Sequence, residues 1–535
     1  MSEDEKTTYK GALAAAMDSG AYIKFVEMHT EMQSEMEAHK QCMFIYWHRL
    51  FLVVFENMLR DQGPKYACVT IPFFNWMEAS NKALTGECKT LGDCSPIMRE
   101  LGGLTGDSQK TMIINGVKVT GTCVAGAPLN HFCQSTSTTG EACAGCLPRG
   151  KWESLKVPAS ISYASVIGQV FNGTNISQVS RAVERGCHAD IHATMGSTMA
   201  KFQSPADPIF WSHHAMLDAL LTIFHKCRVG TRLGKRATGA PFKPTDVVTM
   251  RTGENGTNPT EGSKDPLIGQ YFSGVPNRFA DLMDVSDLGN NSYTYEISGL
   301  LATMYNTCGG MPNPSPAPAA TTASPVPTTN SPQVPSNAPA TTAPTTVTPP
   351  AVPTSPAPTI VSNRNKAKHL HGIRNFFNWL FGKILPESST ASRRLASCRT
   401  VSPTNKRVAE KTKPPAPSDS LRKADTAPVI IATNLTRSEK RVLNWYNEAL
   451  ASNGGQSPEN VADLERQVCM FQEECLGGIV NYTDEFKSLW GVQEPRCRTI
   501  VNAINSGSQK LLNPAWKEKM HAHFGCPHPF NETAS

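Results

Sequence analysis

Histidines fall into two groups in this sequence, and each group could hold one metal ion. The first group contains His29, His39 and His48, and the second contains His188, His192 and the pair His213-His214, about 140 positions later. Imidazole donors with no thiolate or carboxylate beside them suit copper well. Two such groups in one domain therefore predict a paired-copper site that reacts with oxygen.

Helical spacing explains how the second group could converge. His188 and His192 lie four positions apart, so on a helix they share one face. Two histidines at this spacing are weak evidence by themselves, and the later His213-His214 pair supplies the context.

A second helix is predicted to begin just before the histidine pair. Asp207 can act as its N-cap, and Pro208 suits its first turn. This helix would carry His214 and, one turn later, Asp218. We expect the Asp218 carboxylate to orient a ligand imidazole, which is a common arrangement beside metal-binding histidines.

The first group requires a turn in the chain. His39 precedes His48 by nine residues, which would place the two rings on opposite sides of one helix. We therefore expect His39 in a loop and His48 at the start of the apolar helix that follows. His29, in the patterned run YIKFVEMH, is the natural third ligand from a preceding helix.

These segments resemble the tyrosinase and catechol oxidase family of type-3 copper proteins, over about residues 6 to 300. The matching stretches are FVEMHTE, AHKQCMFIYWHRLFLVVFENMLR, IPFFNWMEAS, GCHADIHATMGSTM, SPADPIFWSHHAMLD and the later Tyr293-Thr294-Tyr295. The resemblance implies that His29, His39 and His48 bind copper A and that His188, His192 and His214 bind copper B. His213 is then expected to pack beside the site rather than to bind copper.

The resemblance also implies a fold and a reaction. The fold would be mainly α, with a helical bundle that holds two copper ions. The reaction would use O2 to oxidise o-diphenols to o-quinones, with hydroxylation of monophenols as a further activity, in a pocket shaped for a planar ring. Two alternatives stay open: a haemocyanin-like oxygen-binding protein, and a paralogue that has lost catalysis.

Several positions depart from the family or match it loosely. Ala189 stands where the family often has Asn, which with a nearby Glu holds a water thought to deprotonate monophenols. Glu184 is the candidate for that Glu, and Ala189 is either a neutral change or a sign of weak monophenol hydroxylation. Met216 falls where the family lines the substrate entrance. Glu37 occupies the place of a Cys that some members link to a ligand histidine, so no such link is expected at His39.

Composition indicates a secreted, modular chain. The 535 residues include 39% hydrophobic and 18% charged residues, and no apolar stretch approaches the length of a transmembrane helix. Sixteen cysteines favour disulfides in an oxidising compartment, although no apolar leader precedes the first expected helix. Seven N-glycosylation sequons fit secretion but are weak support.

Three domains or segments are predicted. Residues 1–310 form the copper domain, and residues 311–428 form a linker that is first rich in Pro, Thr and Ala and then basic. The linker contains a short amphipathic helix at 368–385, which could dock on a membrane surface, cover the active site or dock elsewhere on its own protein. The net charge of +6 comes mainly from this segment, and we expect no nucleic-acid partner. Residues 429–535 form a small disulfide-containing helical domain of open role.

Overall fold

The computed structural model describes residues 1–136, 143–173, 175–229, 245–310, 429–432 and 434–526, together with the backbone of 393–395. The predicted helix at 368–385 and most of the predicted linker lie outside the described residues.

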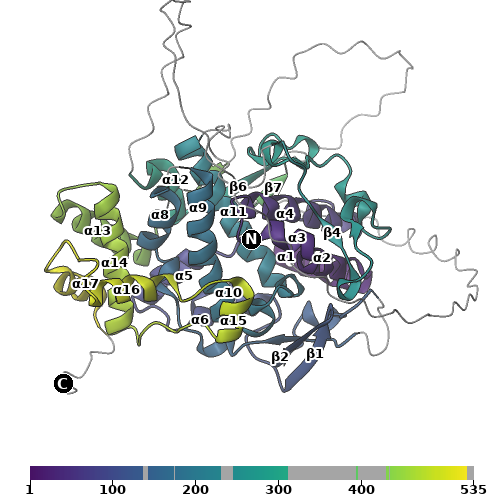
Figure 1. The fold of residues 1–535 in the computed structure, drawn as a ribbon, viewed down its shortest axis with the longest axis horizontal. Helices are drawn as coiled ribbons and strands as arrows, with labels where there is room; N and C mark the ends of the chain where they lie inside the picture. Colours follow the sequence, from purple (N-terminus) through teal and green to yellow (C-terminus); the bar gives the residue numbers. More distant parts are fainter. Residues whose placement is uncertain are drawn as a thin grey trace, which may run out of the picture. The chain divides into compact units, whose positions relative to one another are not determined.

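Helices dominate the described chain, which confirms the mainly-α prediction (Figure 1). The α-helices are α1 Glu3–Asp18, α2 Ala21–Thr30, α3 Met32–Ala38, α4 Phe44–Arg60, α5 Trp76–Leu84, α6 Leu91–Cys94, α7 Pro96–Glu100, α8 Tyr163–Phe171, α9 Ile176–Val183, α10 Ala189–Met195, α11 Pro208–Phe224, α12 Gly299–Thr307, α13 Arg437–Ser452, α14 Pro458–Cys475, α15 Asp484–Trp490, α16 Arg496–Asn505 and α17 Trp516–Phe524. Two π-helical turns, Glu184–His188 and His225–Val229, follow α9 and α11.

The strands are short and form three small sheets. β1 Gln109–Ile114, β2 Val117–Val124 and β3 Leu147–Arg149 pair antiparallel in that order. β4 Arg251–Thr252 pairs with β5 Thr260–Glu261. In the third sheet, β6 Tyr293–Ile297 lies between β7 Arg393–Leu395, which is antiparallel to it, and β8 Val429–Ile431, which is parallel. β7 thus comes from the segment that was predicted from the sequence to be a linker.

The helices that carry the histidines form the centre of the core. α4 is almost wholly buried, because apolar residues cover most of its circumference, and it packs against α11. α11 begins as predicted: the Asp207 side chain accepts a hydrogen bond from the backbone N–H of Ile209, and Pro208 occupies the first turn.

The C-terminal helices pack on this core rather than apart from it. α14 lies along α8, and α13 contacts α5, so that the described C-terminal helices form one compact unit with the described residues before position 311 (Figure 1). A capping box begins α13, because the side chains of Thr436 and Glu439 each accept a hydrogen bond from the other's backbone N–H. Whether the two parts fold as separate domains stays a prediction.

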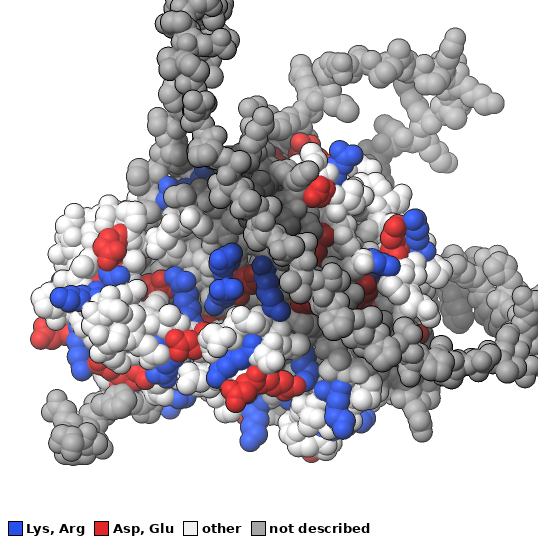
Figure 2. All heavy atoms as spheres, in the orientation of Figure 1, with Lys and Arg blue, Asp and Glu red and all other residues white. Residues whose placement is uncertain are grey.

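Disulfides staple both parts of the described chain. The pairs are Cys88–Cys94, Cys123–Cys146, Cys133–Cys143, Cys227–Cys308, Cys469–Cys497 and Cys475–Cys526. Cys42 and Cys187 are free and buried. Among the described residues, no helix combines the length and the apolar character needed to cross a membrane. Charged side chains of both signs are interspersed on the face that carries α15 and α16 (Figure 2).

Candidate metal centre

The first histidine group converges from three elements, as the sequence predicted. His29 lies near the end of α2, His39 is the extended residue that ends α3, and His48 lies in α4 after the intervening turn. The ring of His29 is 4.8 Å from that of His39 and 5.5 Å from that of His48, measured between centroids. Their ligand atoms all lie within 4.8 Å of one another.

The second group comes from two helices. His188 ends the π-helical turn, His192 lies one turn later in α10, and their ring centroids are 4.5 Å apart. α11 contributes His213 and His214, and the four ligand atoms lie within 4.8 Å of one another. The two groups adjoin, because the rings of His48 and His214 stack with centroids 4.2 Å apart.

The hydrogen bonds of these rings fit metal binding. In four of the histidines, Nδ1 lies within hydrogen-bond distance of a backbone carbonyl: His29 with Phe202 at 2.7 Å, His48 with Phe44 at 2.9 Å, His188 with Glu184 at 3.1 Å and His192 with Met199 at 2.6 Å. Donation from Nδ1 leaves Nε2 as the free acceptor. The Nε2 atoms of His39, His188, His192 and His214 are buried and have no hydrogen-bond partner. Buried nitrogens without a partner are costly unless something else binds them, and a metal ion would do so.

Burial keeps the imidazoles neutral, which is the form that binds a metal. It lowers the pKa of His39 and of His192 to about 3, and it holds the pKa of His188 and of His214 well below the usual range. Neutral imidazole donors in two adjoining groups suit a pair of copper ions.

Asp218 has a different role from the one expected. Both ring nitrogens of His214 lack a hydrogen-bond partner, so the Asp218 carboxylate does not orient that imidazole. It accepts instead from Arg49 Nε at 2.5 Å and from the hydroxyls of Tyr293 and Tyr295, each at 2.5 Å. This buried network joins β6 to α4 and α11, the helices that carry His48 and His214. It gives both tyrosines of the Y-x-Y element a structural role.

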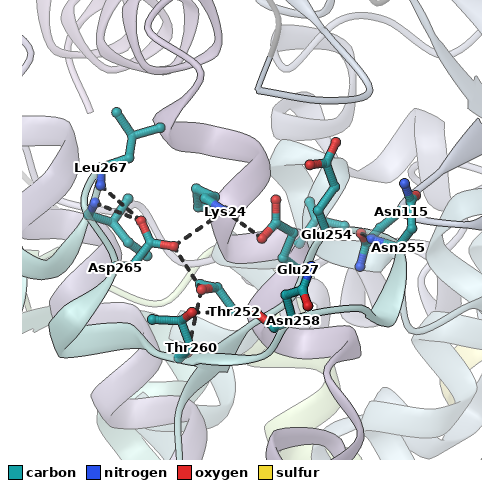
Figure 3. A network of polar contacts seen from close by, with 12 residues as sticks. Lys24, Glu27, Asn115, Thr252, Glu254, Asn255, Asn258, Thr260, Asp265 and Leu267 are labelled. Atoms are coloured by element: carbon teal, nitrogen blue, oxygen red, sulfur yellow. Dashed lines mark hydrogen bonds and ion pairs between the residues drawn. The ribbon is translucent and has the colours of Figure 1, made fainter. Parts of the chain in front are cut away.

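A second polar network fixes α2, the helix that carries His29 (Figure 3). Lys24 Nζ pairs with Glu27 at 2.7 Å and with Asp265 at 3.3 Å. Thr252 donates its hydroxyl to the same Asp265 carboxylate at 2.7 Å. The carboxylate therefore ties α2 to β4 and to the segment that follows β5.

A tryptophan from the C-terminal helices covers the histidines. The Trp490 ring lies 4.9 Å from His192, 5.1 Å from His39 and 5.0 Å from Phe202, between centroids, and its Nε1 donates to the carbonyl of Ala200 at 2.8 Å. None of the seven histidine rings in the two groups belongs to a residue more than 3% exposed. In this form the centre is closed to solvent, with Trp490 as part of its cover.

The segment before Trp490 packs on α10. Tyr482, Phe486 and Trp490 form a small apolar cluster with Ala189, and the Tyr482 hydroxyl bonds to the Asp190 carboxylate. Ala189, the residue that departs from the family pattern, therefore has a packing role beneath this cluster.

The two other predicted site residues lie at different places. Glu184 begins the π-helical turn and is 8% exposed, and its carboxylate accepts from the backbone N–H of Lys40 at 2.5 Å, next to His39. Burial raises the pKa of Glu184 to about 7. Met216 is fully buried in the core of α11.

A third cluster contains residue types that often bind metal ions, but its cysteines are not available as ligands. Cys475, His521 and Cys526 lie close together near the C-terminal end of the described chain. The two cysteines form a disulfide, so they offer no thiolate.

A helical domain with two adjoining groups of neutral, buried histidines defines a candidate dinuclear metal protein of the type-3 copper class. Residues 19–226 match the common central domain of tyrosinase. Tyrosinases from Streptomyces glaucescens and Streptomyces antibioticus are 27% and 26% identical to the chain; each alignment covers 41% of this chain and 78% of the relative. An N-acetyl-6-hydroxytryptophan oxidase from Emericella nidulans is 22% identical over 51% of this chain and 80% of its own length.

Among solved structures, a variant polyphenol oxidase from Thermothelomyces thermophila aligns at 19% identity and a TM-score of 0.29, over 49% of this chain and 82% of its own. These sequence matches support a tyrosinase-family domain over residues 19–226. Members of this family are copper oxidases of the tyrosinase type.

Trp490 and Phe202 were missed by sequence reasoning. Both contact His39. Phe202 lies just before the SPADPIFWSHHAMLD stretch but outside it, and Trp490 ends the distant helix α15, where nothing in the sequence indicates what it covers. His213, predicted to pack beside the site, has both ring nitrogens without a hydrogen-bond partner and lies inside the second group.

Proposed function

We propose that the protein is a secreted phenoloxidase that uses two copper ions and O2 to oxidise o-diphenols to o-quinones. The observation that carries the proposal is the pair of adjoining histidine groups, with buried Nε2 atoms that have no hydrogen-bond partner. His29, His39 and His48 would hold one copper ion, and His188, His192 and His214 the other. The bound pair would supply electron transfer between a phenolic ring and O2.

The residues around the histidines favour an aromatic substrate. Phe202, Phe210 and Phe44 lie against the histidine rings, with centroid distances of 5.2 Å to His39, 4.1 Å to His214 and 4.7 Å to His188, respectively. Trp490 occupies the space beside His39 and His192 that a planar ring would need. Its displacement would leave an apolar, aromatic-walled site.

Secretion is supported by the disulfides, which persist in oxidising compartments. The sequon at Asn481 is exposed and precedes Tyr482 of the covering segment, so a glycan there is sterically possible. Monophenol hydroxylation is expected to be weak, because Ala189 cannot hold a water by hydrogen bonding.

Oxygen uptake by the copper-loaded full chain tests the proposal. Wild type and Trp490→Ala, the latter as an uncovered form, are compared with catechol and with phenol. We expect rapid uptake with catechol in Trp490→Ala and little with phenol. Reversible oxygen binding without consumption, at two copper ions per chain, would favour the haemocyanin-like alternative. Fewer than two bound copper ions would favour the inactive paralogue.

A further inference from the structure

We infer that Gln169 of α8 and Glu465 of α14 are positioning residues for His188, linked to it through a buried hydrogen-bond chain that begins in the C-terminal helices. The inference rests on the proposed metal role of the second histidine group. It assigns the C-terminal helices a part in building that group, in addition to covering it.

The chain ends on the backbone beside His188. Cys187 donates its backbone N–H to Gln169 Oε1 at 2.8 Å, inside the π-helical turn Glu184–His188. Gln169 is fully buried, and its side-chain amide donates to the carbonyl of Ser160 at 2.7 Å and to the hydroxyl of Ser165 at 2.9 Å. With these three bonds, Gln169 has one orientation available, and the turn is fixed against α8.

The other end of the chain lies in the C-terminal helices. Ser165 donates its hydroxyl to Glu465 Oε1 at 2.5 Å, and Arg496 of α16 binds both oxygens of the same carboxylate at 2.6 and 2.7 Å. Glu465 is 3% exposed, so its orientation is set by these partners. Hydrogen bonds therefore connect α16 and α14 through α8 to the residue that precedes His188.

The shape of the turn depends on this contact. At Gly186 a Cβ atom would lie 2.2 Å from Gln169 Oε1 and 3.2 Å from Arg496 Cδ, so only glycine allows the amide this close. π-Helical turns of this kind often occur at functional sites, where they redirect a side chain. Here the turn delivers His188 to within 4.5 Å of the His192 ring, between centroids.

Two substitutions separate positioning from general stability. Gln169→Leu removes the last bond of the chain, and Ser165→Ala removes the link between Glu465 and Gln169 while the Glu465–Arg496 pair stays intact. Substitution of Glu465 itself is avoided, because it would leave the Arg496 charge without its partner. Gln472→Leu is the matched control. Gln472, in α14, is buried like Gln169, but its side chain forms hydrogen bonds to the backbone of Val157 and Ala159 and not to the turn before His188.

Two measurements on the full chain test the inference. The first is copper affinity, measured by competition with a chelator. In a His48→Ala background it reports the affinity of the second histidine group, and in a His214→Ala background it reports that of the first. We expect both test variants to weaken copper at the second group about tenfold, as changes behind metal ligands commonly do, and to leave the first group unchanged. The second is amide hydrogen exchange of the metal-free protein, which should speed up about tenfold at Cys187.

Each outcome decides the question. The inference is overturned if affinity at the second group stays within twofold of the reference, if both groups weaken equally, or if Gln472→Leu has the same effect. If Gln169→Leu does not fold, Ser165→Ala decides alone. If the unsubstituted chain binds no copper, the proposed function fails, and the exchange measurement still tests whether Gln169 holds the turn.

Discussion

The candidate ligand histidines are held by contacts that set both their charge and the direction of the ring nitrogen that faces the site. Burial lowers their pKa, so the rings are neutral at ordinary pH. Backbone carbonyls face Nδ1 in His29, His48, His188 and His192, so that Nε2 points into the site. The Nε2 atoms of His29 and His48 lie 3.4 Å apart, whereas those of His188 and His192 have no hydrogen-bond partner. The protein thus prepares the metal-binding form of these residues before any ion arrives.

Glu184 is a buried acid four residues before His188, and its titration should be measurable. Burial raises its pKa to about 7 from its usual 4.5, so the folded protein binds more protons than the unfolded chain between these values. Stability from this residue is therefore present below pH 4.5 and lost as pH rises through 7. We expect metal-free wild type to lose up to about 3 kcal/mol of unfolding free energy relative to Glu184→Gln between pH 4.5 and 8.

Denaturant unfolding of the two proteins across this range measures the effect, and the comparison cancels the titration of the histidines. A difference in unfolding free energy that does not change with pH would contradict the assignment of a raised pKa to Glu184.

At the scale of elements, the site depends on a few close contacts between secondary-structure elements. α4 and α11 are joined by the buried Arg49–Asp218 pair, which the hydroxyls of Tyr293 and Tyr295 complete from β6. α9 passes into α10 through the π-helical turn, where Gly186 lies against Gln169 of α8. These approaches place residues of distant segments within hydrogen-bond distance.

Gly186→Ala tests the closest of these approaches. The added methyl group would meet Gln169 Oε1 at 2.2 Å, so the amide must move and its bond to Cys187 must lengthen or break. We expect a loss of about 1 to 3 kcal/mol in unfolding free energy, together with weaker copper binding at the second group. Chemical denaturation and copper titration check both effects. Gly274→Ala, a positive-φ glycine with open space around it, provides a comparison for the cost of backbone strain alone.

The sequence predicted the local features of this site and few of the distant ones. The spacing of His188 and His192, the turn between His39 and His48, and the helix start at Asp207 all follow from short-range rules, and the structure has each of them. The partners of Asp218 were predicted wrongly, because a carboxylate one turn from a histidine can equally face a neighbouring helix. Trp490 lies about 300 residues after His192 and about 450 after His39, and no periodic pattern encodes such contacts.

At the scale of the whole molecule, the C-terminal helices do two things to the centre. Through Glu465 they contact the helix that supports His188, and through Trp490 they close the space beside His39 and His192. The residue that covers the histidines and the residues that support His188 therefore come from the same part of the chain. Removal of this part would therefore uncover the site and weaken it at once, whereas a single substitution can separate the two effects.

Trp490→Ala should open the site while the support stays in place. If the closed form outnumbers the open form by about ten to one, loss of the ring raises kcat/KM for catechol by roughly tenfold. Trp490→Phe keeps an aromatic cover and should stay near wild type. Steady-state oxygen uptake at equal copper content makes the comparison. Equal kcat/KM in the alanine and phenylalanine variants would show that Trp490 does not control access.

The number of copper ions per chain tests the central claim most directly. Elemental analysis of the loaded full-length protein should give two copper ions for wild type, and one each for His48→Ala and His188→Ala, because each substitution removes a ligand from one group only. Catechol oxidation should disappear with either ion. Fewer than two copper ions in wild type, or two ions and full activity in His188→Ala, would contradict the assignment of the two histidine groups.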